Sequence, residues 1–195
     1  MLSNLDKYNI ILASQSPRRE ELLRGLNIPF QVKVIEVDET YPEGIFGVDI
    51  PTYLAEKKAN AFSKLMKDDT MLITADTIVW HEGQVLGKPV NKANATAMLN
   101  ALSGKTHQVI TGVCIATLKK RKVFSVISDV RFAKLHPKEI EYYLENYKPY
   151  DKAGSYGVQE WIGFIGVEFI EGSYFNVMGL PIQRLYTELK NWDKY

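Results

Sequence analysis

Two adjacent arginines at the start of an expected helix carry the clearest chemical signal in this sequence. An apolar run, Asn9–Ala13, is expected to form a buried strand that leads into a polar turn ending at Arg18 and Arg19. Ser16 suits a helix N-cap and Pro17 suits the first helical turn, so both arginines fall beside the positive end of the helix dipole. A cation there is disfavoured by about 0.3–1 kcal/mol, whereas a bound anion reverses the penalty. The segment predicts phosphate binding, with an ordinary solvated helix start as the alternative.

Asp76 is the second candidate, because it is a carboxylate inside a run otherwise suited to a buried strand, Met71–Trp80. A buried charge is costly unless it is paired, hydrogen-bonded or used in chemistry. We therefore expect Asp76 to act as a general base. The alternative is a structural ion pair with a lysine.

Three further residues are candidates on weaker local signals. Lys88 follows a glycine that lets the backbone approach a ligand closely, although a plain turn is the commoner meaning of Gly-Lys-Pro. Glu39 lies in an acidic segment that suits either a hard divalent metal or a solvated loop. Lys58 lies beside Lys57 on an expected helix, where adjacent side chains point about 100° apart. At most one of these two lysines is therefore expected to face a given pocket.

Other chemistries are disfavoured. Ser103–His107 resembles part of a phosphate loop but lacks the first glycine of a Walker motif. Cys114 is the only cysteine, so an intrachain disulfide and a cysteine-based zinc site are excluded, and an inert core thiol is expected. His81 and His107 have no partner at metal-ligand spacing, so core or surface roles are expected. A net charge of +1 argues against broad electrostatic binding of nucleic acid.

Size and composition are those of an ordinary soluble protein. The chain has 195 residues, of which 46% are hydrophobic and 24% charged, and we expect a single domain over residues 1–195. No apolar run reaches the roughly 20 residues of a membrane-spanning helix. Residues 1–8 lack the charged start and apolar stretch of a signal peptide, so a cytoplasmic location is the expectation.

Strand-like and helical runs alternate along the chain, which predicts a mixed α/β or α+β fold around a sizeable sheet. A hairpin is expected to turn at Lys119–Lys122, and the segment from 151 to 166 reads as a glycine-rich loop. The expected strands are 9–13, 30–37, 71–80, 109–118 and 123–135, and the expected helices are 17–26, 51–67, 91–102, 137–147 and 181–192.

Six blocks, in order, resemble the Maf family of nucleoside triphosphate pyrophosphatases and together span about residues 9 to 190. They are Ala13–Arg19, Ala75–Thr77, Gly87–Pro89, Leu102–His107, Asp151–Gln159 and Gly172–Pro181. The resemblance implies an elongated mixed sheet with helices, in two lobes around a deep cleft, related to the inosine triphosphate pyrophosphatases. It also implies cleavage of a nucleoside triphosphate to the monophosphate and pyrophosphate with Mg²⁺ or Mn²⁺.

The resemblance also assigns roles to residues. Asp76 matches the proton acceptor, and Glu39 matches an acidic residue at the metal and water site, so these two are the implied metal ligands. Lys88 matches a phosphate-binding position and is implied, with Asp76 and Glu39, to be catalytic. The other residues implied to bind substrate are Ser14, Arg18, Arg19, Lys58, Thr77 and Gln159, of which Arg18, Thr77 and Gln159 match the dTTP/UTP type.

Two alternatives stay open at this stage. One is a house-cleaning pyrophosphatase for modified nucleotides, and the other is a nucleotide-binding regulator of cell division with little turnover. The partner expected in every case is a small nucleotide, with no nucleic acid and no membrane. The resemblance also suggests a homodimer.

Overall fold

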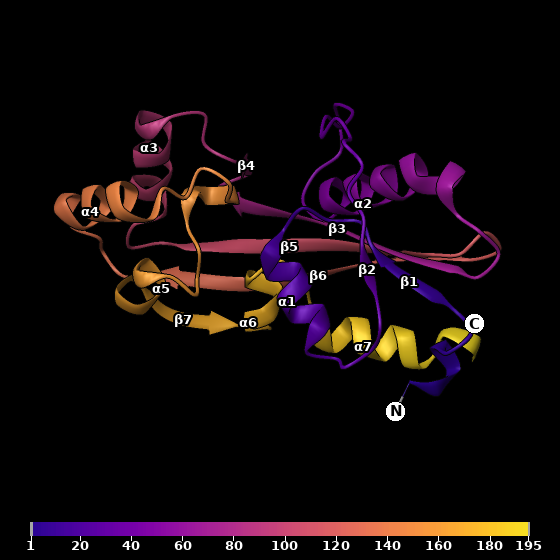
Figure 1. Cartoon of the computed structure of the whole chain (residues 1–195). Helices are drawn as coiled ribbons and strands as arrows, with labels where there is room; N and C mark the ends of the chain where they lie inside the picture. Colours follow the sequence, from indigo (N-terminus) through magenta and orange to yellow (C-terminus); the bar gives the residue numbers. More distant parts are fainter. Residues whose placement is uncertain (1, 195) are drawn as a thin grey trace. The chain divides into compact units, whose positions relative to one another are not determined.

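A computed structural model of the chain describes residues 2–194 and consists of a mixed sheet with helices (Figure 1). Its seven strands follow the order β2-β1-β3-β5-β6-β7, and β4 pairs with β3. The strands are β1 (Asn9–Leu12), β2 (Gln31–Val32), β3 (Thr70–His81), β4 (Gln84–Leu86), β5 (Thr106–Ala116), β6 (Arg121–Phe132) and β7 (Val167–Glu171). The α-helices are α1 (Pro17–Arg24), α2 (Asp49–Phe62), α3 (Lys92–Leu102), α4 (Pro137–Tyr147), α5 (Trp161–Gly166), α6 (Tyr174–Val177) and α7 (Ile182–Lys190).

The sheet is mixed because its strand pairs differ in direction. β1 is parallel to both β2 and β3, whereas β3 with β4 and β6 with β7 are antiparallel. Short 3₁₀ turns at Ser3–Leu5, Ser63–Leu65, Ala153–Ser155 and Trp192–Lys194 complete the described elements. The mixed α/β class expected from the sequence is confirmed.

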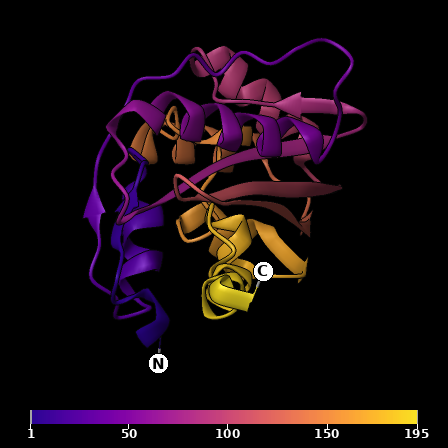
Figure 2. The same ribbon diagram turned by 90° about the vertical axis from the view of Figure 1, so that its right-hand side faces the viewer.

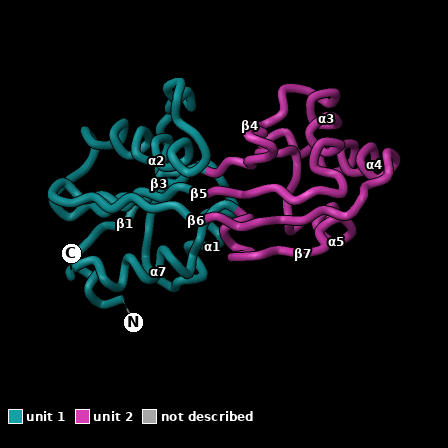
Figure 3. Tube along the Cα trace, turned by 180° about the vertical axis from the view of Figure 1, so that it is seen from behind, with its two compact units in different colours: residues 1–76, 111–126, 179–195 teal, residues 77–110, 127–178 magenta. Residues whose placement is uncertain are grey.

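The chain divides into two compact units whose segments alternate along the sequence (Figure 3). Unit 1 takes in the chain up to Asp76, residues 111–126, and the chain from Gly179 onward, and unit 2 takes in 77–110 and 127–178. The long strands β3, β5 and β6 each contribute residues to both units. The single domain expected over residues 1–195 stays a prediction, and so does the deep cleft. Residues 1 and 195 lie outside the described part of the chain.

In unit 1, α2 covers one side of the strands and α7 lies on the other (Figures 1 and 2). The apolar stripe of α2 packs through Ala55, Ala59 and Phe62 on a buried cluster that includes Leu72. At Gly112 a Cβ atom would lie 2.3 Å from the backbone of α2, so only glycine allows this close approach.

The alternation of side chains along β3 decides where Asp76 points. Residues two apart in a strand share a face, so Leu72, Thr74 and Asp76 all face α2. Thr74 donates a hydrogen bond to the carbonyl of Ala55 at 2.6 Å, which fixes the distance between the helix and the strand. Lys58 lies one helical turn beyond Ala55, on the same stripe of α2. Asp76 of β3 and Lys58 of α2 therefore lie close together where the helix packs on the strand.

Unit 2 has its own core, built between the sheet and the helices α3 and α4. Leu99 and Leu102 from α3, Tyr143 from α4 and Phe132 from β6 belong to one buried cluster. α4 begins at Pro137, as expected. The side chain of His136 caps the helix, and the carboxylate of Glu139 accepts a hydrogen bond from the backbone N–H of His136.

Several sequence expectations were wrong in extent, among them the hairpin strands expected over 109–118 and 123–135, which are Thr106–Ala116 and Arg121–Phe132. The strand expected over 30–37 is only Gln31–Val32, because its partner β1 ends at Leu12 and the last bond between them joins the Lys33 N–H to Leu12. The helix expected to reach 67 ends at Phe62, where Ser63 takes over as a cap and a 3₁₀ turn follows. The helix expected over 181–192 spans Ile182–Lys190, and a separate 3₁₀ turn follows it.

The glycine-rich stretch expected over 151–166 ends in the helix α5, and the edge strand β7, which the sequence did not predict, follows it. Gly163 serves packing there, since a Cβ atom at this position would lie 1.8 Å from the carbonyl oxygen of Val158. β7 escaped prediction because its residues are mostly exposed, so no run of buried positions marks it.

Candidate active site

The turn between β1 and α1 is shaped by serine side chains, as the sequence predicts. Ser16 is the N-cap of α1 and accepts from the N–H of Arg19 at 3.5 Å, and Pro17 occupies the first turn. Ser14, which is buried, accepts from the N–H of Ser16 at 3.1 Å. Arg18 and Arg19 therefore lie in the first turn of the helix, where its free N–H groups attract anions.

The glutamates of α1 give limited support to the alternative reading, an ordinary solvated helix start. Glu20 pairs with Arg24, one turn along the helix, in an exposed contact. Such exposed pairs contribute little to stability.

Arg19 has a structural contact set that the sequence did not reveal. Its Nε donates to the carbonyl of Gly179 and its Nη1 to the carbonyl of Ala75, both at 2.8 Å. Removal from solvent lowers the pKa of Arg19, and the charges of Asp76 and Glu39 oppose that shift. The guanidinium thus ties the start of α1 to the backbone immediately before Asp76.

Lys58 joins the two carboxylates that were expected to bind a metal. Its Nζ lies 2.6 Å from Oδ1 of Asp76 and 2.8 Å from Oε1 of Glu39. The side chains of Lys58 and Asp76 are largely buried, at 16% and 10% exposure, whereas Glu39 is more open at 45%. The ion pair with a lysine, which was the alternative for Asp76, is therefore present in the structure, and its lysine also pairs with Glu39, another predicted site residue.

Lys57 holds the same acidic segment from its outer side. Its Nζ donates to the carbonyl of Thr40 at 2.8 Å and lies 3.7 Å from Asp38. Asp38 in turn accepts from the N–H of Thr40, and this hydrogen bond, with the bond to the Thr40 hydroxyl, lowers the pKa of Asp38. Of the two adjacent lysines, only Lys58 contacts Asp76, in agreement with the expected angle between them.

The donor set around Lys58 suits a hard divalent cation. Two carboxylate oxygens, from Glu39 and Asp76, converge on one positive group, the ammonium of Lys58. Within residues 2–194 no group of three or more His, Cys, Asp or Glu residues could enclose a metal. Mg²⁺ suits such a partial set, because it commonly binds through one or two carboxylates together with substrate phosphates and water.

The remaining predicted residues, Thr77, Lys88 and Gln159, belong to unit 2. Thr77 and Gln159 are partly buried, and Lys88 is exposed. The segments that carry Lys88 and Gln159 are linked, because the N–H of Gly154 donates to the carbonyl of Gly87 at 3.1 Å. Gly154 has a positive φ of 68°, and a Cβ there would lie 2.8 Å from Val79, so the backbone passes close to β3.

Sequence reasoning missed the residues that hold the Gln159 segment. Lys152 and Glu160 form an ion pair at 3.0 Å, and Tyr143 of α4 contacts Glu160. Lys152 stood inside a recognised motif block, but no spacing rule predicts that Tyr143 reaches it. Cys114 is buried, as expected, and of the core and surface roles left open for His107 the structure shows the core role. Burial lowers the pKa of His107 to about 3 and raises that of Cys114 to about 11.

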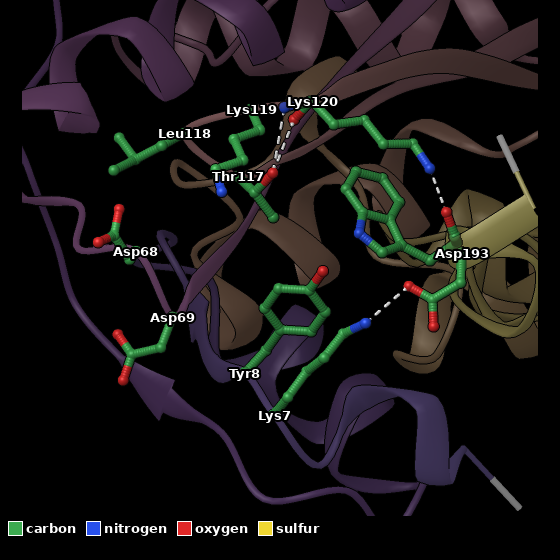
Figure 4. Close-up of a pocket in the computed structure, with 10 residues that line it drawn as sticks. Lys7, Tyr8, Asp68, Asp69, Thr117, Leu118, Lys119, Lys120 and Asp193 are labelled. Atoms are coloured by element: carbon green, nitrogen blue, oxygen red, sulfur yellow. Dashed lines mark hydrogen bonds and ion pairs between the residues drawn. The ribbon is translucent and has the colours of Figure 1, made fainter.

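Unit 1 also has a pocket of about 530 Å³ that contains none of the predicted site residues (Figure 4). Tyr8, Lys120 and Trp192 are among the residues that line it. Two of its lysines engage protein groups: Lys7 pairs with Asp193 at 3.0 Å, and Nζ of Lys120 lies 4.3 Å from the centre of the Trp192 ring. With aspartates also lining it, this pocket is a poor match for a polyanion.

Comparison with known proteins identifies the class. The family model described as Maf-like protein matches residues 9–192, so the chain belongs to the Maf family. Among its relatives, a Bacteroides fragilis (strain YCH46) protein is 60% identical over 97% of this chain and 99% of its own length, and a Parabacteroides distasonis protein is 61% identical over 98% and 100%. Both relatives are named dTTP/UTP pyrophosphatase.

A solved structure, that of the Staphylococcus aureus Ham1 protein, aligns over 64% of this chain and 72% of that chain. Its sequence identity is 17% and its TM-score is 0.48, so this likeness supports no inference about the site. Within residues 2–194, no helix has both the length and the apolar character needed to cross a bilayer.

Proposed function

We propose that this protein is a nucleoside triphosphate pyrophosphatase that hydrolyses dTTP and UTP to the nucleoside monophosphate and pyrophosphate. The observation that carries the proposal is the contact of Lys58 with both Asp76 and Glu39, beside the helix start that bears Arg18 and Arg19. The names of relatives at about 60% identity over nearly the whole chain support the same activity.

In the proposed reaction Asp76 acts as the general base. It accepts a proton from a water molecule whose oxygen attacks the α-phosphorus. A bond forms between that oxygen and the phosphorus, and the bond from the α-phosphorus to the bridging oxygen of the β-phosphate breaks. Pyrophosphate leaves with that oxygen. A positioned general base contributes roughly 10²–10⁴-fold to a rate.

The cations of the site neutralise charge on the triphosphate. Arg18, Arg19, Lys58 and Lys88 are the proposed phosphate ligands, and Ser14 completes the turn beneath them. Oxygen charge grows on the phosphoryl group during transfer, so fixed cations stabilise the transition state more than the ground state. Lys58 has a second task, because it also holds the carboxylate of Asp76 in place.

Glu39 and Asp76 are the proposed ligands of a divalent metal, Mg²⁺ or Mn²⁺. When bound, such an ion supplies positive charge next to the phosphate oxygens. Lys58 keeps the two carboxylates at one place before substrate arrives.

Base selection is proposed to depend on Thr77, Arg18 and Gln159. Thymine and uracil offer an acceptor, a donor and an acceptor along O2, N3 and O4, whereas cytosine presents an acceptor at N3 and a donor at position 4. The amide of Gln159 both donates and accepts, so it can match the first pattern. A mismatch leaves buried polar groups unpaired, which is costly.

A panel of nucleotides tests the proposal. Purified protein with Mg²⁺ or Mn²⁺ is given dTTP, UTP, dCTP, GTP and dITP, and both pyrophosphate and inorganic phosphate are measured. We expect pyrophosphate release from dTTP and UTP well ahead of dCTP, with no nucleoside diphosphate. Equal rates on all pyrimidine triphosphates would refute the assigned selectivity, and faster turnover of dITP would favour a role in clearing modified nucleotides.

The proposal includes a cytoplasmic location, expected from the sequence, and a homodimer, suggested by the family resemblance, and does not include binding to nucleic acid. A purely regulatory role, with tight nucleotide binding and little turnover, is the competing view. The panel separates the two, because a regulator binds dTTP without releasing pyrophosphate.

A further inference from the structure

The backbone around Gln159 is held by a charged pair that is mostly shielded from water. Lys152 is 9% exposed, and its Nζ lies 3.0 Å from Oε1 of Glu160 and 2.8 Å from Oδ1 of Asp151. The pair closes a loop of eight peptide bonds, with Gln159 just inside one end. Removing one partner of a buried pair is costly because the other charge is left uncompensated.

Tyr143, from helix α4, connects this pair to the backbone of the loop. Its side chain is fully buried, its hydroxyl donates to Oε2 of Glu160, and the same hydroxyl accepts from the N–H of Gly157 at 3.0 Å. Burial raises the pKa of Tyr143, and the hydrogen bond to Glu160 raises it further. The phenol therefore stays protonated at neutral pH and keeps donating to Glu160.

The loop has little freedom to adjust around these contacts. At Gly157 a Cβ atom would lie 2.8 Å from Cδ of Glu160 and 3.1 Å from Cε of Lys152. The next side chain towards the N-terminus, Tyr156, is buried, and its hydroxyl lies 2.7 Å from Nε2 of His107. Val158 is buried as well, whereas Gln159 is only partly buried.

We propose that Tyr143, Lys152 and Glu160 are positioning residues for nucleotide selection. They fix the backbone that carries Gln159, so that its amide meets the pyrimidine edge in one orientation. This inference rests on the proposed function, because it assumes that Gln159 reads the base. A displaced amide still binds a pyrimidine but discriminates less between uracil or thymine and cytosine, because discrimination depends on aligned donors and acceptors.

The variant Tyr143→Phe tests the inference, because it removes one oxygen and retains the ring. We expect the ratio of kcat/KM for dTTP to kcat/KM for dCTP to fall by about five- to tenfold, the size of one lost positioning hydrogen bond. The loss should come mainly from a higher KM for dTTP, since no group that contacts the phosphates is changed. Amide hydrogen exchange of the peptide covering 152–160 should become faster in the protein without nucleotide.

Tyr142→Phe is the matched control. Tyr142 is the preceding residue of α4, it is 47% exposed, and its ring contacts Trp161 at 4.7 Å between centroids. This variant should leave both the selectivity ratio and the exchange of 152–160 unchanged. Glu160→Gln is the second test variant, because it keeps the side-chain volume and removes the charge opposite Lys152. It still tests the inference if the Tyr143 variant fails to fold.

The results separate this inference from the proposed function. An unchanged selectivity ratio in both folded test variants overturns it, even when hydrogen exchange has increased. If Gln159→Ala loses selectivity and the two test variants do not, only the positioning role is wrong. If the wild-type protein itself does not prefer dTTP to dCTP, the proposed base selection is wrong, and this inference is overturned with it.

Discussion

Arg19 binds the backbone of two segments far apart in sequence, one of which leads directly into the proposed base, Asp76. Sequence reasoning treated it as a phosphate ligand, but two of its donors bind the carbonyls of Ala75 and Gly179. A planar guanidinium can serve two fixed acceptors at once, which an ammonium on a flexible stem cannot reproduce. We infer that Arg19 positions the peptide that precedes Asp76, in addition to any contact with phosphate.

Replacing Arg19 by lysine should therefore cost activity although the charge is kept. We expect Arg19→Lys to lower kcat for dTTP by about tenfold or more, because small displacements of catalytic groups are costly. The loss of one hydrogen bond should also reduce the free energy of unfolding by about 1 kcal/mol. Steady-state kinetics and urea unfolding measure both effects.

Arg24→Lys provides the comparison within the same helix. Arg24 is exposed, pairs with Glu20 and lies over the ring of Phe30 at 5.7 Å from its centre. This change should leave kcat and stability near their wild-type values. If Arg19→Lys behaves like Arg24→Lys, the positioning role of Arg19 is wrong.

At the scale of elements, the start of β5 meets the loop after α4 through a buried histidine. His107 is 2% exposed and bonds Tyr156, and its ring packs edge-on against Tyr156 and Phe132. Desolvation lowers the pKa of His107 from 6.5 to about 3, and the nearby His81 adds to the shift. His107 is therefore neutral in the folded protein at neutral pH.

This shift predicts a pH-dependent stability. The unfolded chain binds a proton at His107 below pH 6.5, whereas the folded protein does so only near pH 3. The contribution to stability is therefore complete above pH 6.5 and is lost as the pH falls from about 6.5 towards 3. When the pH is lowered from 7 to 5, the free energy of unfolding should fall by about 2 kcal/mol more in the wild-type protein than in His107→Gln. Urea unfolding at each pH measures this difference.

His136→Asn is the control for that series. His136 is exposed and caps α4, and asparagine is also a good N-cap. Its pH profile shows how much of the change comes from replacing a histidine outside the buried site. A His107→Gln profile parallel to the wild-type profile over this range would show that burial does not hold His107 neutral.

At the scale of the whole molecule, the periodic and capped elements were the predictable ones. Pro137–Tyr147 follows from a capping residue and a regular apolar stripe, and β3 follows from a long apolar run. β2 was predicted but made too long, and β7 was not predicted, because exposed edge strands depend on the partner strand more than on their own residues. The assignment of chain segments to two interleaved units likewise reflects contacts between residues far apart in sequence.

The candidate site was predictable where function requires a particular residue type in a motif. Asp76 was recognised because a carboxylate in a buried strand is unusual, and Lys58 and Glu39 were carried over from the family resemblance. The structure places these three together. The supporting contacts were not predictable, because Arg19 binds backbone carbonyls and Tyr143 acts from a distant helix, and neither leaves a sequence signature.

Whether one carboxylate activates water is the question that decides the proposed chemistry, and turnover of dTTP by Asp76→Asn measures it most directly. The matched control is Asp68→Asn, the same chemical change at an exposed residue before β3. Asp76→Glu keeps a carboxylate that can still pair with Lys58 and moves it by one methylene, so it shows how far the position of the base matters. With all variants folded, pyrophosphate release by Asp76→Asn should fall by about 10²–10⁴-fold, and Asp68→Asn should match the wild-type rate. Release by Asp76→Asn at the wild-type rate would contradict the assignment of Asp76 as the base.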